Sequence, residues 1–336
     1  MTFWIFLAAA LSFAVSAVVG RFLIPYLHKL HFGQTILDIG PRWPKSKEGT
    51  PTMGGFMFIA GITLAVIVTY AGAAIGGALP VGGINRPLDF QLFSGLVLAL
   101  AFGAMGFADD FVKVVKKRNL GLTAKQKLVI QFAIAILYLW NIRLGGTTVT
   151  AVRIPFFAGP WQLGWLYYPL CAIGIVFIVN SVNLTDGVDG LAASVTLMAS
   201  LGFLGAAAVL QFSRVSLLAA ATAGGCMGFL LYNFHPARVF MGDTGSMFLG
   251  GCVVAMAFGL NFPLILALTG FIYIIESLSV VLQVISFQTT GRRIFKMSPI
   301  HHHFEMSGWG EVKIVCVFSM ITLAMSALAV LAAMRL

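Results

Sequence analysis

Residues 164–210 read GWLYYPLCAIGIVFIVNSVNLTDGVDGLAASVTLMASLGFLGAAAVL. The two apolar runs in this stretch, 164–182 and 190–210, each have close to the length of about 20 residues that a helix needs to cross a membrane. The loop between them, 183–189, is short and polar and carries two aspartates. The stretch therefore predicts a helical hairpin inside a membrane, with a polar tip at one membrane face.

The rest of the chain repeats this pattern, without an evident linker or internal repeat. The 336 residues are 59% hydrophobic and only 10% charged, whereas ordinary soluble domains are about 25% charged. This composition excludes a soluble protein of this size. We predict an all-α polytopic membrane protein, a single transmembrane domain over residues 1–336, with ten spans near 3–27, 54–76, 92–108, 128–142, 164–182, 190–210, 215–233, 247–260, 262–287 and 314–334.

The loops alternate between the two sides of the membrane. One side receives loops 28–53, 109–127, 183–189, 234–246 and 288–313, which together hold 15 of the 21 lysine and arginine residues. Loops rich in lysine and arginine remain in the cytoplasm. We therefore expect a multi-pass membrane protein with both termini outside, in the periplasm or its equivalent.

The ionisable groups gather on this same cytoplasmic side. Nine of the eleven acidic residues and all six histidines lie at or in these loops, and the acidic exceptions are Asp89 and Glu276. A transport path would place ionisable groups within the spans. The distribution favours an enzyme that works at the membrane surface.

Two adjacent carboxylates, Asp109 and Asp110, close the third span. They repel each other and lose hydration at a membrane boundary, which a bound cation or nearby lysines would offset. Neighbouring residues on a helix face different ways, so the two acids are expected to have different roles. An ordinary charged helix end is the alternative.

Two further loops combine glycine with carboxylates: NLTDGVDG at 183–190 and FMGDTGS at 240–246. Glycine amides and helix N-termini suit phosphate. The carboxylate of Asp243 suits Mg²⁺, which prefers oxygen ligands and often shares them with substrate phosphates. Polar turns that cap the following helices remain the alternative reading.

The last cytoplasmic loop holds SPIHHHFE at 298–305. Three consecutive histidines cannot readily converge on one metal in a regular segment, so hydrogen bonds to phosphate or sugar oxygens are the expected use. A solvated loop is the alternative. Several carboxylates, cationic groups and a magnesium site on one membrane face are the parts that phosphoryl transfer needs.

These motifs, together with GTPTMGG at 49–55, resemble the polyprenyl-phosphate N-acetylhexosamine-1-phosphate transferases, and the resemblance covers essentially the whole chain. The triple histidine favours the muramoyl-pentapeptide branch. The resemblance implies transfer of phospho-MurNAc-pentapeptide from UDP-MurNAc-pentapeptide to the membrane lipid undecaprenyl phosphate, which gives lipid I and UMP. It also implies a multi-pass protein of the bacterial cytoplasmic (inner) membrane, a requirement for Mg²⁺, a homodimer and no nucleic-acid partner.

The resemblance also assigns site residues. Asp243 would hold the metal. The catalytic residues would be Asp109, Asp110, Asp243, Lys125 and His302. The substrate-binding residues would be Lys47, Thr52, Asn183, Asp186, Asp189, Asn233, Phe240, Gln283, His301 and His303.

Other functions stay open at this point. The same reaction could use UDP-N-acetylglucosamine as the donor. A lipid flippase or ion-coupled transporter would need charges along the spans, where Arg21 and Glu276 are among the few. A purely structural scaffold would leave five aspartates in loops of one side without a purpose.

Overall fold

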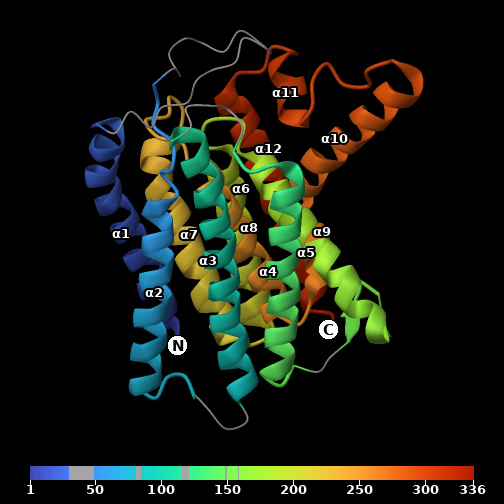
Figure 1. Cartoon of the computed structure of the whole chain (residues 1–336). Coiled ribbons are helices and arrows are strands. Elements are labelled where there is room, and N and C mark those ends of the chain that lie inside the picture. The colour runs from blue at the N-terminus through green and yellow to red at the C-terminus, as the bar shows by residue number, and fades with distance from the viewer. Residues whose placement is uncertain (30–48, 81–84, 116–120, 148–149, 158) are drawn as a thin grey trace.

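The structure, a computed structural model, describes residues 1–29, 49–80, 85–115, 121–147, 150–157 and 159–336. Its main elements are long helices that run between the two ends of a bundle (Figure 1). The long helices are α1 (Thr2–Lys29), α2 (Phe56–Ile75), α3 (Arg86–Val115), α4 (Ala124–Leu144), α5 (Tyr167–Thr185), α6 (Leu191–Val209), α7 (Ser213–Asn233), α8 (Gly242–Gly259), α10 (Phe271–Thr290) and α12 (Glu311–Ala333).

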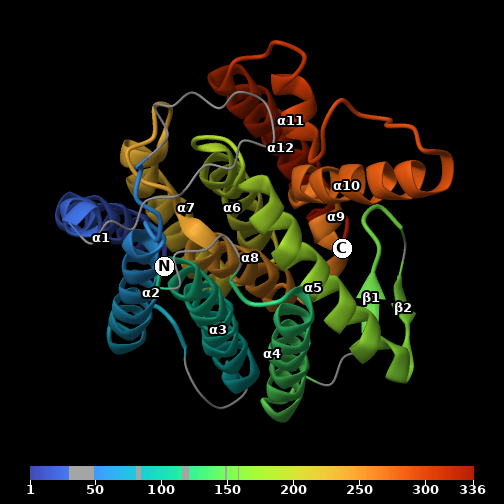
Figure 2. The same cartoon turned by 45° about the horizontal axis from the view of Figure 1, so that its top comes forward.

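Within the described residues, nine of these helices are long and apolar enough to cross a membrane. The chain is therefore a multi-pass membrane protein. The helix α8, predicted as a further span at 247–260, is not among the nine, and its first turn carries Gly242 and Asp243. Every residue of α8 from Thr244 onward is buried, because α3, α5, α6 and α7 surround it (Figure 2). A helix enclosed by protein needs less apolar surface than one that faces lipid.

The predicted span 262–287 is not one helix. The chain forms a 3₁₀ turn at Pro263–Ile265, a short helix α9 (Leu266–Thr269) and then α10, with Gly270 at the break. Glycine weakens a helix because it loses more backbone freedom than other residues. After the break, α10 leans away from the bundle (Figure 1).

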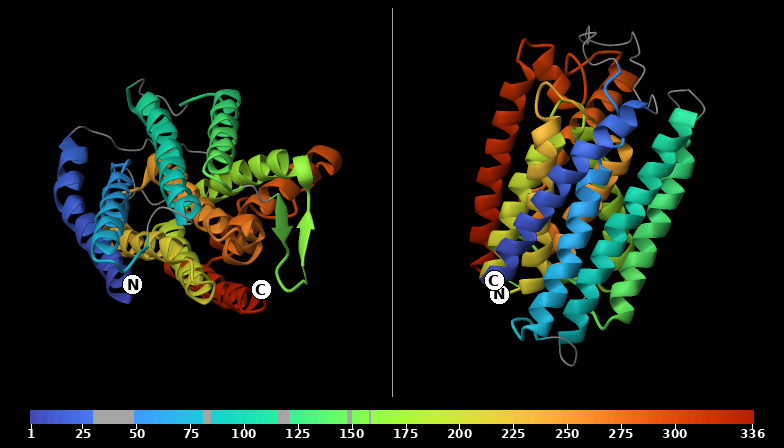
Figure 3. Two further views of the ribbon diagram at one scale, coloured as in Figure 1. Left: turned by 90° about the horizontal axis from the view of Figure 1, so that it is seen from below. Right: turned by 90° about the vertical axis from the view of Figure 1, so that its left-hand side faces the viewer.

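The outer segment after α4 holds a small antiparallel hairpin of β1 (Ala151–Arg153) and β2 (Pro160–Gln162), with Val152 opposite Trp161. This hairpin and both chain termini lie at one end of the bundle (Figures 1 and 3). The connections that carry the acidic and histidine motifs lie at the opposite end, where the short helix α11 (Ile300–Glu305) also lies. Both termini thus lie at the same end of the bundle, opposite the motifs, while the membrane side of each end stays a prediction.

Candidate active site

The centre of the site is the contact between α3 and the first turn of α8. Gly106, one turn before the paired aspartates, lies so close to α8 that a Cβ atom on it would be 2.1 Å from the backbone oxygen of Asp243. Any larger residue would separate the two helices. This close approach brings Asp109 and Asp110 next to Asp243.

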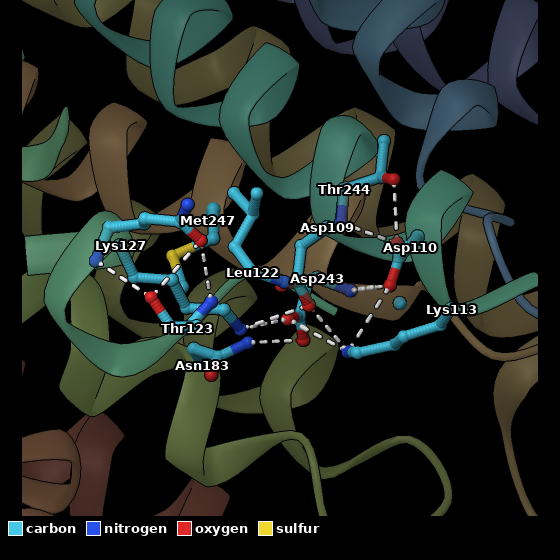
Figure 4. Close-up of polar contacts among 12 residues, drawn as sticks. Asp109, Asp110, Lys113, Leu122, Thr123, Lys127, Asn183, Asp243, Thr244 and Met247 are labelled. Atoms are coloured by element: carbon cyan, nitrogen blue, oxygen red, sulfur yellow. Dashed lines mark hydrogen bonds and ion pairs between the residues drawn. The ribbon is translucent and has the colours of Figure 1, made fainter. Parts of the chain in front are cut away.

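Asp110 caps α8 from the neighbouring helix (Figure 4). Its Oδ1 accepts a hydrogen bond from the backbone N–H of Asp243 at 3.2 Å, and its Oδ2 accepts from the N–H and hydroxyl of Thr244 at 2.9 and 2.7 Å. The first amides of a helix lack partners within the helix, and a carboxylate there is also favoured by the helix dipole. Asp110 therefore fixes the position of the α8 N-terminus.

Asp109 faces a different set of groups. Its buried Oδ2 lies 2.7 Å from Lys113 Nζ and 2.9 Å from Lys127 Nζ, and its Oδ1 accepts from the backbone N–H of Leu122 at 2.7 Å. The same two ammonium groups lie 3.1 and 2.9 Å from Asp243 Oδ2 (Figure 4). The two lysines thus bridge the carboxylates of Asp109 and Asp243.

Asn183, from the end of α5, completes this network. Its amide nitrogen donates to Asp243 Oδ1 at 3.0 Å and to Ser246 Oγ at 2.7 Å. Burial alone would raise the pKa of the Asp243 carboxyl. The contact with Asp109 and the two nearby ammonium groups outweigh burial and hold that pKa well below its usual range.

Asp186 has the opposite electrostatic environment. Burial raises the pKa of its carboxyl well above the usual value, and the negative charges of Asp243, Asp110 and Asp189 raise it further. Asp186 therefore lies within the field of the acidic cluster and would gain from a cation bound there.

One carboxylate oxygen from each of Asp109, Asp110 and Asp243 lies within 4.8 Å of the other two, and these three oxygens could hold a metal ion. A set of oxygen donors suits Mg²⁺. All six oxygens of these carboxylates already have protein partners: those of Asp110 bind the first turn of α8, and Oδ2 of Asp109 and of Asp243 lies beside the two lysine ammonium groups. An ion bound by Asp109 and Asp243 would therefore compete with Lys113 and Lys127.

The segment around Thr52 pairs with the segment around Phe240. The N–H of Phe240 donates to the backbone oxygen of Pro51, and Gly54 N–H donates to the oxygen of Phe240, both at 2.8 Å. Thr52 is buried and Phe240 is half-buried. These backbone bonds attach the start of α2 to the loop that leads into Asp243.

A second cluster joins Asp189, His235 and Glu311, whose side-chain ligand atoms lie within 4.8 Å of one another. His235 Nδ1 is 3.0 Å from Asp189 Oδ2, and Glu311 accepts from the Asp189 backbone N–H at 3.1 Å. Asn233 accepts from Gly190 N–H and donates to the backbone oxygen of Val239. Asn233 therefore ties the 183–190 loop to the loop after α7.

The three histidines of α11 all use Nδ1. His301 Nδ1 lies 3.0 Å from Glu276 Oε2, and His302 Nδ1 lies 2.5 Å from Glu305 Oε2. His303 Nδ1 accepts from the backbone N–H of Lys296 at 3.1 Å. Each of the three histidines thus uses Nδ1 for a contact within this end of the protein.

Gln283 anchors the loop between α10 and α11. Its side-chain oxygen accepts from the N–H groups of Ile294 and Phe295, both at 3.0 Å, and its nitrogen donates to the oxygen of Phe295. The amide oxygen and one N–H of Gln283 thus hold this loop. Contact of Gln283 with a substrate stays a prediction.

The structure brings together Asp109, Asp110, Asp243 and Asn183 as expected, and it adds Lys113 and Lys127. Lys125 is exposed and lies in the first turn of α4, two residues before Lys127. The signal for Lys113 was present in the sequence, since it follows Asp109 by four residues on one helix face. Lys47 lies outside the described residues.

Comparison with known proteins agrees with this geometry. The model of glycosyl transferase family 4 matches residues 92–261. The chain is 44% identical to a phospho-N-acetylmuramoyl-pentapeptide-transferase of Desulfitobacterium hafniense over 98% of each chain. It is 45% identical to that of Heliobacterium modesticaldum, over 98% of this chain and 97% of the relative. It is also 46% identical to the phospho-N-acetylmuramoyl-pentapeptide-transferase of Caldanaerobacter subterraneus, over 95% of each chain. The chain therefore belongs to the phospho-N-acetylmuramoyl-pentapeptide-transferases, within glycosyl transferase family 4.

Proposed function

We propose that this protein transfers phospho-MurNAc-pentapeptide from UDP-MurNAc-pentapeptide to undecaprenyl phosphate, which gives lipid I and UMP for peptidoglycan synthesis. The observation that carries the proposal is the full-length similarity to transferases of that name. The site agrees in its chemistry, because carboxylates and lysines converge at one end of a membrane bundle. Phosphoryl transfer relies mainly on such positioning and charge neutralisation.

The proposed reaction is a direct displacement. A phosphate oxygen of the lipid attacks the β-phosphorus of the donor, a new P–O bond forms, and the bond from that phosphorus to the UMP oxygen breaks. Asp109 orients the lipid phosphate and accepts any remaining proton. Because the second pKa of a phosphate monoester is about 6, little proton removal is needed. Lys113 and Lys127 balance the charge on the phosphates.

Asp110 has a supporting role in this proposal. Its two oxygens hold the amides and hydroxyl of the first turn of α8, so attack by Asp110 on a phosphate would remove that cap. A covalent route through Asp109 is the rival. A sugar-phosphoryl adduct trapped on Asp109 in the absence of acceptor lipid would contradict direct displacement.

The proposal includes dependence on Mg²⁺. Asp243 would hold the ion, with Asp109 beside it, since their oxygens belong to the cluster that spans 4.8 Å. When bound, Mg²⁺ neutralises charge on the donor diphosphate. Asn183 keeps the Asp243 carboxylate in its orientation through the 3.0 Å hydrogen bond.

The acceptor must approach from the membrane, and α10 is the element that leans outward at the site end (Figure 1). Its outer face carries exposed apolar side chains, including Val281, Leu282 and Ile285. A polyprenyl chain could lie along this surface. The bacterial inner membrane as the location, and a homodimer as the assembly, are part of the same proposal.

The test is UMP release by the purified protein in detergent, with undecaprenyl phosphate and Mg²⁺ present. UDP-MurNAc-pentapeptide and UDP-N-acetylglucosamine are supplied in parallel, and Asp243→Ala is the control. Release with the muramoyl donor alone, lost on chelation and in the variant, supports the proposal. Release only with the glucosamine donor would assign the other donor. Lipid flux without UMP release would favour a flippase.

A further inference from the structure

Glu276 is a fully buried carboxylate in the membrane-spanning helix α10. Burying such a group in a span is costly unless it is paired and hydrogen-bonded. Its Oε2 lies 3.0 Å from His301 Nδ1 and also accepts, at 3.5 Å, from the His301 backbone N–H. The main partner of Glu276 is therefore His301, the first histidine of α11.

The pair fixes the His301 ring in one orientation. The 3.0 Å contact directs Nδ1 of the ring to Glu276, whichever of the two atoms carries the shared proton. The ring is fully buried and lies 4.1 Å, centroid to centroid, from the ring of His302. With Nδ1 directed to Glu276, Nε2 points to the opposite side of the ring.

That side faces Gly187, in the loop between α5 and α6. A Cβ atom built on Gly187 would lie 2.2 Å from His301 Nε2 and 2.8 Å from Cε1. Within the described chain, His301 Nε2 has no hydrogen-bond partner. The ring therefore packs directly on the glycine backbone, and a side chain at 187 would displace either the ring or the loop.

Gly187 lies between Asp186 and Asp189. The same loop begins at Asn183, which holds Asp243, and ends at Gly190, which Asn233 binds. A shift of the loop at Gly187 would move Asp186 relative to the acidic cluster, whose charges already act on its carboxyl.

We infer that Glu276 is a positioning residue: it holds the His301 ring against Gly187 and thereby sets the 183–190 loop for the nucleotide donor. The side-chain contacts of Glu276 are with His301, so its effect would pass through that ring. The inference rests on the proposed function for its kinetic readout. It predicts that changes in this chain of contacts raise KM for the donor more than they lower kcat.

The first arm of the test compares Glu276→Ala with Glu276→Gln in the full-length protein. Glutamine keeps an oxygen that can accept from His301 Nδ1, so we expect partial rescue. For Glu276→Ala we expect the KM for the donor to rise about tenfold, which is the size of effect that the coupling between contacting residues usually gives. Ser279→Ala is the matched control, because Ser279 is buried on the same helix and binds only the Glu276 backbone oxygen among the contacts described.

The second arm is a double-mutant cycle of Gly187→Ala with His301→Ala. Gly187→Ala alone should raise donor KM about tenfold, because the new Cβ meets the ring. In the His301→Ala background the same change should add less than about twofold. Additive effects would overturn the inference, as would a fall in kcat with unchanged KM.

A readout independent of activity separates this inference from the proposed function. We expect Glu276→Ala to speed amide hydrogen exchange in residues 183–190 more than elsewhere, with the control unchanged. Faster exchange throughout the protein would indicate general destabilisation and contradict a positioning role. If the wild-type protein releases no UMP, the proposed function fails, and this local exchange still decides the inference.

Discussion

At the scale of single residues, two lysines in the first turn of α4 have different surroundings. Lys127 Nζ lies 2.9 Å from both Asp109 and Asp243, whereas Lys125 is exposed. Two positions apart on a helix correspond to nearly opposite faces, so only one of them can point to the site. The resemblance favoured Lys125, and the geometry favours Lys127.

We therefore expect Lys127→Met to lower kcat/KM by about 100-fold, because removing one positioned charge from a phosphoryl-transfer site costs roughly that much. Lys125→Met should cause a much smaller loss. Steady-state UMP release measures both. A larger loss for Lys125 than for Lys127 would contradict the arrangement around Asp109.

The second prediction at this scale concerns pH and Asp186. Its carboxyl pKa is raised in the folded protein by burial and by Asp243, Asp110 and Asp189. At pH values between the pKa of Asp186 in the unfolded protein and its higher pKa in the folded protein, the folded state binds more protons than the unfolded state. The free energy of unfolding therefore falls as the pH rises through this range. Asparagine cannot ionise, so Asp186→Asn removes this loss of stability at high pH. The variant should be more stable than wild type at pH 8, and its advantage should be smaller at pH 5.

Thermal unfolding of the purified, magnesium-free protein, followed by tryptophan fluorescence at several pH values, measures this difference. Bound Mg²⁺ should reduce the gain, because a nearby cation stabilises the ionised carboxyl. An equal gain at both pH values would show that Asp186 does not titrate in this way.

At the scale of elements, the α3–α8 contact depends on a cap that one helix supplies to another. Asp110→Ala would leave the amides of Asp243 and Thr244 without their acceptor, which costs about 1–3 kcal/mol for buried groups. Asp110→Asn keeps an oxygen but loses the charge that the α8 dipole favours. We expect both variants to unfold at lower temperature than wild type, with alanine lower.

Because the cap also fixes the backbone of Asp243, activity per folded molecule should fall in the same order. Ser94→Ala is the matched control: Ser94 lies in the outer half of α3 and donates to Asn141 at 2.8 Å. It should lose stability slightly and keep its activity. If Asp110→Ala unfolds at the same temperature as the wild-type protein, the capping role is ruled out.

The elements also show what the sequence could and could not predict. The spans were predictable because apolar runs of the required length have few other uses. The break at Gly270 was not, because a single glycine inside an apolar run is tolerated in many helices and only packing decides where the chain bends. The short helix α11, which carries the three histidines, was also not predictable, because six residues are too few to show a helical spacing of apolar side chains.

At the scale of the whole molecule, the site forms where separate segments meet. Asp109 and Asp110 were recognisable because adjacent carboxylates at a span end are unusual. Glu311 was not, because its bond to the Asp189 backbone joins positions 122 residues apart, and no local pattern encodes such a contact. That the chain forms one domain, and that the predicted residues bind substrate, stay predictions.

The last prediction concerns which membrane face carries the site. The loops predicted for the side of the motifs hold 15 of the 21 lysine and arginine residues, which predicts that this side faces the cytoplasm. Gln162, in β2, and Ser307, after α11, are both exposed and lie at opposite ends of the bundle. In a Cys316→Ser background, where the other three cysteines are buried, Gln162→Cys and Ser307→Cys report the two faces. We expect a membrane-impermeant maleimide to label Gln162→Cys in intact cells and Ser307→Cys only after permeabilisation. The reverse pattern would place the carboxylates outside, where a cytoplasmic nucleotide donor could not reach them, and would contradict both the orientation and the proposed reaction.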